Sequence, residues 1–314
     1  MQRSVLVLVI MSVIMLAFLP WIASDVMLQF AINTLLLATL AQSWNILGGF
    51  AGYVSFGNSV FYGLGTYGTA IAMAQFGLPF WVGLMLGALL AVICALIVGL
   101  PILRLRGPYF AIATLGLSGV MGAIVSNMDI AGANIGLILP LTRADPMFYE
   151  LSLGLLVVTT VCVAWLSMSR FGMALIAIRE DEDAAGTMGV NTTRYKVAAL
   201  VLASLFTSIA GGIHAYWITF VDPASAFDPT LNVRMVIMAV FGGSGTVFGP
   251  VIGSFLLSTI YELLAFWIST AAALLFGVVI VLAVLFMPKG IADLALAKEP
   301  GWRYFLRNVR EHRL

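Results

Sequence analysis

Long apolar runs follow one another along nearly the whole chain, separated by short breaks. Each run has about 18 to 25 residues, enough for a helix to cross a hydrocarbon core roughly 30 Å thick. Hydrophobic residues make up 62% of the 314 residues and charged residues 9%, against about 45–50% and about 25% in an ordinary soluble domain. The runs predict an all-α polytopic membrane protein, a single transmembrane domain over residues 1–314 with about 8 to 10 transmembrane helices.

Glycine, proline and charged residues mark the ends of the predicted spans. We place the spans near residues 4–22, 27–47, 54–76, 80–103, 108–127, 148–167, 197–219, 233–243, 248–266 and 268–286. The first run is too long for the apolar core of a secretory signal, so we interpret it as a retained span. The run at 233–243 has only half the usual length, which indicates that some helices are discontinuous. Between the spans, residues 131–147 fit either a helix or a loop.

Basic residues orient the chain, because Lys and Arg near span ends favour the cytoplasm. With the N-terminus inside, only Arg143 and Arg234 of the 15 basic residues fall outside. The tail at 287–314 is then cytoplasmic if the short run at 233–243 counts as a crossing. We therefore expect both termini in the cytoplasm.

Two glycine-rich breaks follow spans that run from outside to inside. They are GGFAGYVSFG at 48–57 and GGSGTVFG at 242–249. Internal repeats with discontinuous helices at equivalent places are typical of transporters. The alternative is that such stretches look alike by chance, or serve the close packing that small residues allow in membranes.

No motif for catalysis is present. A phosphate-binding loop needs a Lys followed by Ser or Thr after its glycines, and the three lysines here precede Val197, Gly290 and Glu299. The sequence has no HExxH and no Cys/His spacing that suits a metal. Cys94 and Cys162 both lie in apolar runs, which favours free thiols. We expect no catalytic residue, no metal site and no cofactor in this chain.

Polar residues inside the spans are candidates for function, because they are costly there unless they pair or face water. They are Asn33, Gln42, Asn45, Asn58, His214 and Glu262. Each either bonds a neighbouring helix or lines a pathway. As the candidate translocation pathway we name residues in and beside the two breaks: Asn45, Gly49, Gly52, Ser55, Asn58, Gly242, Gly243 and Gly245.

Apart from Glu262, the acidic residues lie in the outer and inner segments. Six fall outside and four consecutive ones, Glu180 to Asp183, fall inside; the outer ones are Asp25, Asp129, Asp145, Glu150, Asp222 and Asp228. Carriers driven by protons or sodium place acidic residues near the midplane. We therefore expect the energy source to lie outside this chain.

One long polar stretch, RFGMALIAIREDEDAAGTMGVNTTRYKV at 170–197, interrupts the apolar pattern on the cytoplasmic side. Its residues suit a short helix, a break at a glycine, and a second helix with Asn191 or Thr192 as its N-cap. A solvated loop that only fixes the topology is the alternative. Because such an anchor needs just two or three basic residues, the length favours a docking segment.

This stretch resembles a known motif. Its Asp-Ala-Ala-x-x-x-Gly at 183–189 is similar to the Glu-Ala-Ala-x-x-x-Gly of ABC importer permeases, in which a cytoplasmic coupling helix fits a cleft on the ATPase. The chain as a whole resembles the LivM-type permeases of branched-chain amino-acid importers. The matching pieces are WNILGGFAGYVSFGNSVFYGLGTY (44–67), LRLRGPYFAIATLGLS (103–118), the stretch at 170–197, VFGGSGTVFGPVIG (240–253) and LFMPKGIADL (285–294).

The resemblance implies a permease in a bacterial cytoplasmic (inner) membrane. It implies four kinds of partner: a homologous second permease of the LivH type, two ATPases that bind ATP and Mg, an extracytoplasmic solute-binding protein received by the outer acidic segments, and membrane lipid. Nucleic acid is not among them. The cytoplasmic coupling segment would be residues 170–196, with coupling residues Ala177, Arg179, Glu180, Asp181, Glu182, Asp183, Ala184, Ala185 and Gly189.

The substrate stays open at this point. Sister systems, by resemblance, carry branched-chain and other hydrophobic amino acids, urea, short amides or aromatic acids. A secondary carrier or an ATP-independent channel for a small neutral solute are the alternatives from other classes. The cytoplasmic segment distinguishes them, because a channel has no use for it.

Overall fold

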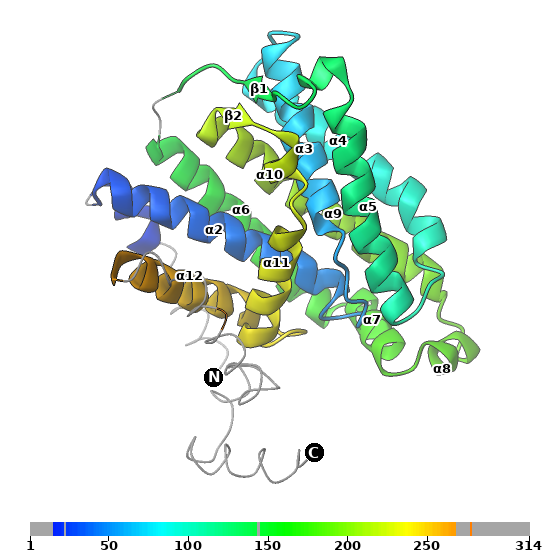
Figure 1. Ribbon diagram of the computed structural model, residues 1–314. Coiled ribbons are helices and arrows are strands. Elements are labelled where there is room, and N and C mark those ends of the chain that lie inside the picture. Colours follow the sequence, from blue (N-terminus) through cyan, green and yellow to red (C-terminus); the bar gives the residue numbers. More distant parts are fainter. Residues whose placement is uncertain (1–14, 22, 143–144, 268–276, 278–314) are drawn as a thin grey trace.

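The computed structural model describes residues 15–21, 23–142, 145–267 and 277 (Figure 1). Its elements in chain order are η1 (Leu19–Trp21), α2 (Asp25–Leu47), α3 (Asn58–Ala74), α4 (Phe80–Ile102), α5 (Pro108–Ser126), η2 (Asp129–Ala131), β1 (Leu137–Ile138), α6 (Asp145–Met168), α7 (Arg170–Glu180), α8 (Glu182–Thr187), α9 (Thr192–Ile218), β2 (Phe220–Val221), α10 (Pro223–Ala226), α11 (Pro229–Gly242) and α12 (Gly249–Trp267).

The helical membrane fold is as predicted. Five described helices, α2, α4, α5, α6 and α9, are long and apolar enough to cross a membrane. Of the other predicted spans within the described residues, α3 has 17 residues and α11 has 14, and α12 has 19. Most of the predicted span at 4–22, nearly all of that at 268–286 and the tail at 287–314 lie outside the described residues.

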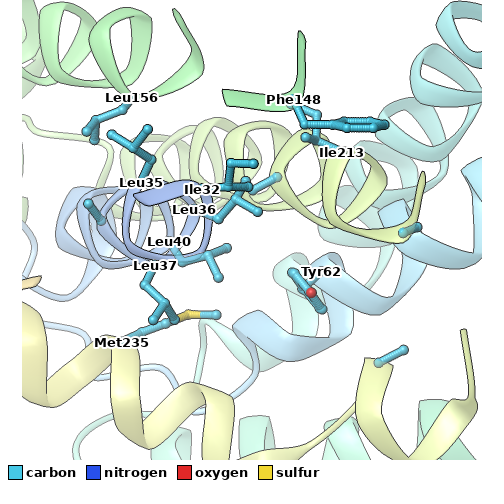
Figure 2. Close-up of a cluster of buried hydrophobic side chains, with 14 of the residues drawn as sticks. Ile32, Leu35, Leu36, Leu37, Leu40, Tyr62, Phe148, Leu156, Ile213 and Met235 are labelled. Atoms are coloured by element: carbon cyan, nitrogen blue, oxygen red, sulfur yellow. The ribbon is translucent and has the colours of Figure 1, made fainter. Parts of the chain in front are cut away.

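The core is built around α2, which packs against α6, α9, α11 and α12. Leucines and isoleucines of this helix meet Phe148 of α6, Ile213 of α9 and Met235 of α11 (Figure 2). Polar side chains near the inner end of α2, such as Gln42 and Asn45, are fully buried as well. From Thr34 to Leu47 the helix is buried on all sides, which suits a central position in a large bundle.

Small residues let α3, α4 and α9 approach closely. A Cβ added to Gly65 of α3 would lie 2.0 Å from the carbonyl oxygen of Ser208 on α9. One added to Gly68 would lie 2.5 Å from Cα of Gly87 on α4. Because lipid gives little hydrophobic drive for helix association, such close contacts are a main source of stability.

The segment at 131–147 is neither a helix throughout nor a plain loop. It contains β1, which pairs antiparallel with β2, so that Leu137 lies opposite Val221 and Ile138 opposite Phe220. Helix α6 already begins at Asp145. The strand pair and α10 lie at the end of the molecule opposite α7 and α8 (Figure 1).

The polar stretch at 170–197 forms two short helices before α9, where we expected one helix before the glycine break. Asp181 separates α7 from α8, and its side chain accepts hydrogen bonds from the backbone N–H groups of Asp183 and Ala184. Aspartate prefers such capping positions to helix interiors. The break at Gly189, which has a φ of +88°, and the Asn191 N-cap of α9 are as predicted.

Candidate functional site

The two glycine-rich breaks lie side by side at the inner end of α2. The Asn45 side chain joins them, since its Nδ2 donates to the carbonyl of Thr246 at 2.9 Å and its Oδ1 accepts from the N–H of Gly245 at 2.7 Å. Gln42 Nε2 donates to the carbonyl of Val247 at 2.8 Å. Gly49 faces the second break so closely that a Cβ there would lie 2.5 Å from the nitrogen of Gly245.

One side chain of α7 reaches both breaks. Arg179, near the end of α7, donates from Nη1 to the carbonyl of Gly49 at 3.1 Å. Its stem lies over Gly52, where an added Cβ would be 2.7 Å from Arg179 Cγ, and its Nη1 would be 2.8 Å from a Cβ on Gly245. Gly52 and Gly245 have φ values of +74° and +77°, which glycine adopts at little cost.

A buried cluster fixes α8 to the first break. Glu182 of α8 accepts a hydrogen bond from Lys196 Nζ at 2.5 Å and another from the hydroxyl of Tyr53 in the break. Lys196, whose side chain is 3% exposed, also donates to the carbonyl of Leu103 and to the Tyr53 hydroxyl, each at 2.9 Å. All three ammonium donors of this lysine therefore have a partner.

A second ion pair lies at the edge of this cluster. Arg106 binds both carboxylate oxygens of Asp183, at 2.8 and 2.9 Å. The hydrogen bonds and charge of Arg106 hold the pKa of Asp183 below its usual range. Burial alone would raise the pKa of Glu182, but the hydrogen bonds from Lys196 and Tyr53 and the charge of Lys196 outweigh it and lower that pKa. Both carboxyls are thus held in their charged forms.

The predicted coupling residues divide into two groups. Arg179, Glu182 and Asp183 make the contacts that connect α7 and α8 to the rest of the protein, and Ala185 is buried. The others are exposed on these helices and the turn after them: Ala177, Glu180, Asp181, Ala184 and Gly189. Their role in docking stays a prediction.

The sequence did not single out Tyr53, Arg106 and Lys196 as partners of this segment. Lys196 offered a signal, since it is a lysine at the start of an apolar span and an ionisable group there needs a partner. The identity of the partners depends on contacts across more than 70 residues of sequence in the case of Arg106 and Asp183.

The predicted pathway residues are only partly gathered in one place. Asn45, Gly49, Gly52 and Gly245 meet at the junction described above. Gly242 and Gly243 end α11 against α12, where a Cβ on Gly242 would lie 1.8 Å from the carbonyl oxygen of Gly249.

Ser55 and Asn58 lie farther along the first break. Ser55 Oγ accepts from the N–H of Gly57, and Asn58 is buried with its Nδ2 unpartnered among the described residues. Because the Asn45 amide is already bonded to the second break at both ends, it acts as a structural link. A pathway role for these residues stays a prediction.

Within the described residues, no group of three or more His, Cys, Asp or Glu could hold a metal ion, and Cys94 and Cys162 are free thiols. What the geometry provides is a mechanical connection: α7 and α8 cannot shift without displacing Arg179, Glu182 and the breaks to which these are bonded.

Comparisons with known proteins match this architecture to one family. The family model described as "Branched-chain amino acid transport system / permease component" matches residues 26–285. The high-affinity branched-chain amino acid transport permease LivM of Escherichia coli K12 is 28% identical over 321 residues, which cover 92% of this chain and 75% of that protein.

Two further relatives match a smaller part. LivH of Escherichia coli K12 is 27% identical over 128 residues, 40% of this chain and 41% of LivH. The nucleoside ABC transporter permease NupC of Lactococcus lactis is 29% identical over 118 residues, 36% of this chain and 37% of NupC. No solved structure matches the chain.

Proposed function

Because this chain belongs to the family of permease components of branched-chain amino-acid transport systems, we propose that it is one of two transmembrane permeases in an ATP-driven importer. The second permease is a LivH-like homologue. Two ATPases on the cytoplasmic side bind ATP and Mg, and a solute-binding protein delivers the substrate from outside. The membrane is the bacterial cytoplasmic membrane, with both termini of this chain inside.

The connection from α7 through Arg179 to both glycine-rich breaks is the observation that supports this function best. An importer must convert closure of its ATPases into a change in which side the transport path faces. A push on α7 and α8 would reach Gly49 and Gly245 through a single side chain. A channel without ATPases has no use for such a connection.

The ATPases would dock on the exposed side of α7 and α8. Ala177, Asp181 and Ala184 are exposed there, and Met188 is 85% exposed after α8. A contiguous surface of small, acidic and thioether side chains suits a cleft on another protein, since exposed apolar groups that gather beside polar ones mark interaction sites. ATP binding and hydrolysis remain on the partner subunits, so this chain is not itself an enzyme.

The substrate we propose is a branched-chain or other hydrophobic amino acid. The support is the length over which LivM matches this chain, compared with the shorter match to the nucleoside permease NupC. Urea, short amides and aromatic acids are the alternatives within the same architecture.

The test is the ATPase activity of the complex purified through this subunit and reconstituted in lipid. We expect two ATPases to co-purify with this subunit. In Arg179→Ala we expect the ATP hydrolysis that the loaded binding protein stimulates to fall at least about tenfold. The substitution removes the hydrogen bond of a charged group together with its packing, and the free energy of such a hydrogen bond corresponds to about this factor. Arg104→Ala, an exposed cytoplasmic arginine, is the matched control and should behave as the wild type.

Two results would contradict the proposal. One is solute flux through the purified chain without ATP and without any co-purified ATPase, which would make the protein a channel. The other is an assembled Arg179→Ala complex with unchanged stimulation, which would remove the coupling role of this side chain.

A further inference from the structure

A cavity of about 180 Å³ lies between α2, α3, α9, α10 and α11, away from the cytoplasmic junction. Its lining residues are Asn33, Leu36, Leu37, Leu40, Tyr62, His214, Ser225, Asp228, Thr230, Leu231 and Arg234. Since one water needs about 10–15 Å³ of such space, the cavity holds on the order of ten water-sized positions. This is enough for a small amino acid.

Two charges of opposite sign line the cavity. Asp228 is the N-cap of α11, and its carboxylate accepts from the N–H and the hydroxyl of Thr230. Arg234 lies on the same helix, six residues after Asp228, and lines the same cavity. Ion pairs in the described part of the chain all lie at the cytoplasmic end, so neither Asp228 nor Arg234 belongs to one.

An arginine without a counter-ion is unusual in such a position. Arg234 is exposed on a helix that belongs to an apolar bundle, and it is one of the two basic residues that the positive-inside rule leaves on the outer side. Ionisable groups in membrane helices pair with one another or mark a substrate path. A carboxylate is the ligand that a guanidinium fork binds best.

Another part of the cavity lining is apolar. Leu36, Leu37 and Leu40 of α2 form it, and Tyr62 of α3 stands across from them (Figure 2). The hydroxyl of Tyr62 is hydrogen bonded to Nδ1 of His214 at 2.6 Å, which fixes the ring that borders the leucines. The cavity thus has one anionic side chain, one cationic side chain and an aliphatic wall.

We propose that this cavity binds the zwitterion of an apolar α-amino acid. Arg234 binds the carboxylate, Asp228 accepts from the ammonium group with the lone pairs that Thr230 leaves free, and Leu36, Leu37 and Leu40 contact the side chain. This assignment deepens the proposed function and rests on it. A neutral amide or urea would leave both charges without a partner, and an organic acid would leave Asp228 without one.

The experiment measures protection of a cysteine placed at the cavity. Thr230→Cys is introduced into the complex in a background of Cys94→Ala and Cys162→Ala, and its rate of reaction with a thiol reagent is followed. Millimolar leucine should slow the reaction. Isoamylamine, which lacks the carboxylate, and 4-methylpentanoate, which lacks the ammonium group, should not protect at the same concentration.

Conservative substitutions of the two charged residues test the site without a large change of side-chain volume that could disturb folding. Arg234→Gln and Asp228→Asn should raise the leucine concentration for half protection by about tenfold to a hundredfold, as expected when a charge-assisted hydrogen bond is lost. Arg234→Lys should raise the leucine concentration for half protection by a smaller factor, because lysine keeps the positive charge. Arg104→Gln, which changes an exposed charge that does not line the cavity, is the control and should match the parent.

The outcomes separate this proposal from the function on which it rests. Equal protection by 4-methylpentanoate, or unchanged protection in Arg234→Gln and Asp228→Asn, overturns the zwitterion site even if the complex imports leucine with ATP. ATP-driven import of urea in place of amino acids overturns the site together with the proposed substrate. Failure of the ATPase test with intact leucine protection overturns the importer and leaves the site.

Discussion

Lys196 shows how a full charge is kept inside an apolar protein. Its ammonium group is surrounded by the carboxylate of Glu182, the hydroxyl of Tyr53 and the carbonyl of Leu103, and it lies 4.4 Å from the centre of the Tyr53 ring. A buried charge is tolerated only when it is paired and hydrogen bonded in this way. The lysine therefore fixes three segments, the first break, the end of α4 and α8, at one point.

Removing one charge of this cluster while the other stays buried should destabilise the fold. We expect Glu182→Gln to lower the free energy of unfolding by about 3 kcal/mol, because it leaves Lys196 as an uncompensated buried charge. The double variant Glu182→Gln/Lys196→Met should recover part of that loss, since it removes both charges. Thermal unfolding of the purified complex in one detergent measures both, and equal losses in the single and double variants would contradict the buried-charge explanation.

The cluster also makes the position of α8 depend on pH. The folded-state pKa values of Glu182 and Asp183 are lowered, so their contribution is present above their ordinary values, about 4.3 and 3.9, and is lost as pH falls through the lowered ones. A nitroxide label at Met188→Cys should be restrained at pH 7 and should become mobile near pH 3. In Glu182→Gln the label should already be more mobile at pH 7; a label equally restrained at both pH values in the parent would contradict this.

At the scale of the elements, the bundle depends on where its glycines lie. α3 meets α9 and α4 through Gly65, Gly68 and Gly211, each with backbone of the neighbouring helix within 2.5 Å of a hypothetical Cβ. Gly116 in α5 has nothing within 4 Å. Glycine is therefore needed for close helix packing in α3, whereas at Gly116 of α5 a larger side chain would meet no neighbouring atom.

A pair of alanine substitutions tests this difference. Gly65→Ala should destabilise the fold by about 1–3 kcal/mol or more, because the methyl group overlaps the Ser208 carbonyl and forces the helices apart. Gly116→Ala should be neutral or stabilise by up to about 1 kcal/mol through its higher helix propensity. The melting temperatures of the two purified variants test this difference. Equal values would show that α3 and α9 do not pack this closely.

The sequence predicted the helices well, because each apolar run is long enough to define its own span. The polar stretch at 170–197 and both glycine-rich breaks were also located from local pattern alone. The pairing of β1 with β2 was not, since two residues on each side carry no periodicity and the partners are about 80 positions apart, as in Leu137 and Val221. The division between α7 and α8 at Asp181 was missed for a different reason: Asp181 is one of four consecutive acidic residues, and only its contacts with the N–H groups of Asp183 and Ala184 mark it as the N-cap.

The candidate site was predicted only in outline. Arg179 and Glu182 were named from their place in the cytoplasmic stretch, and Asn45, Gly49 and Gly245 from their place in the breaks. That these two sets touch one another depends on how α2, α7 and α11 pack, which no single stretch encodes. The cavity with Asp228 and Arg234 was out of reach for the same reason, because its apolar wall comes from α2.

At the scale of the whole molecule, the two ends have different characters. One end has α7 and α8, with the Arg106, Arg179 and Lys196 ion pairs; the other has the β1–β2 pair and α10 (Figure 1). The cavity lined by Asp228 and Arg234 lies beside α10 and the middle of α2, so a substrate that enters from the β1–β2 end reaches it before the glycine-rich breaks. The proposed import direction requires that this end faces outward.

Labelling of single cysteines tests that orientation. Ile135 near β1 is 83% exposed and Met188 after α8 is 85% exposed, so both accept a probe without repacking. With Cys94 and Cys162 replaced by alanine, a membrane-impermeant thiol reagent added to intact cells should label Ile135→Cys. It should label Met188→Cys only after the membrane is permeabilised, because the basic residues beside α7 and α8 favour the cytoplasm. The reverse pattern would place the proposed ATPase-docking helices on the wrong side of the membrane and exclude the coupling role of Arg179.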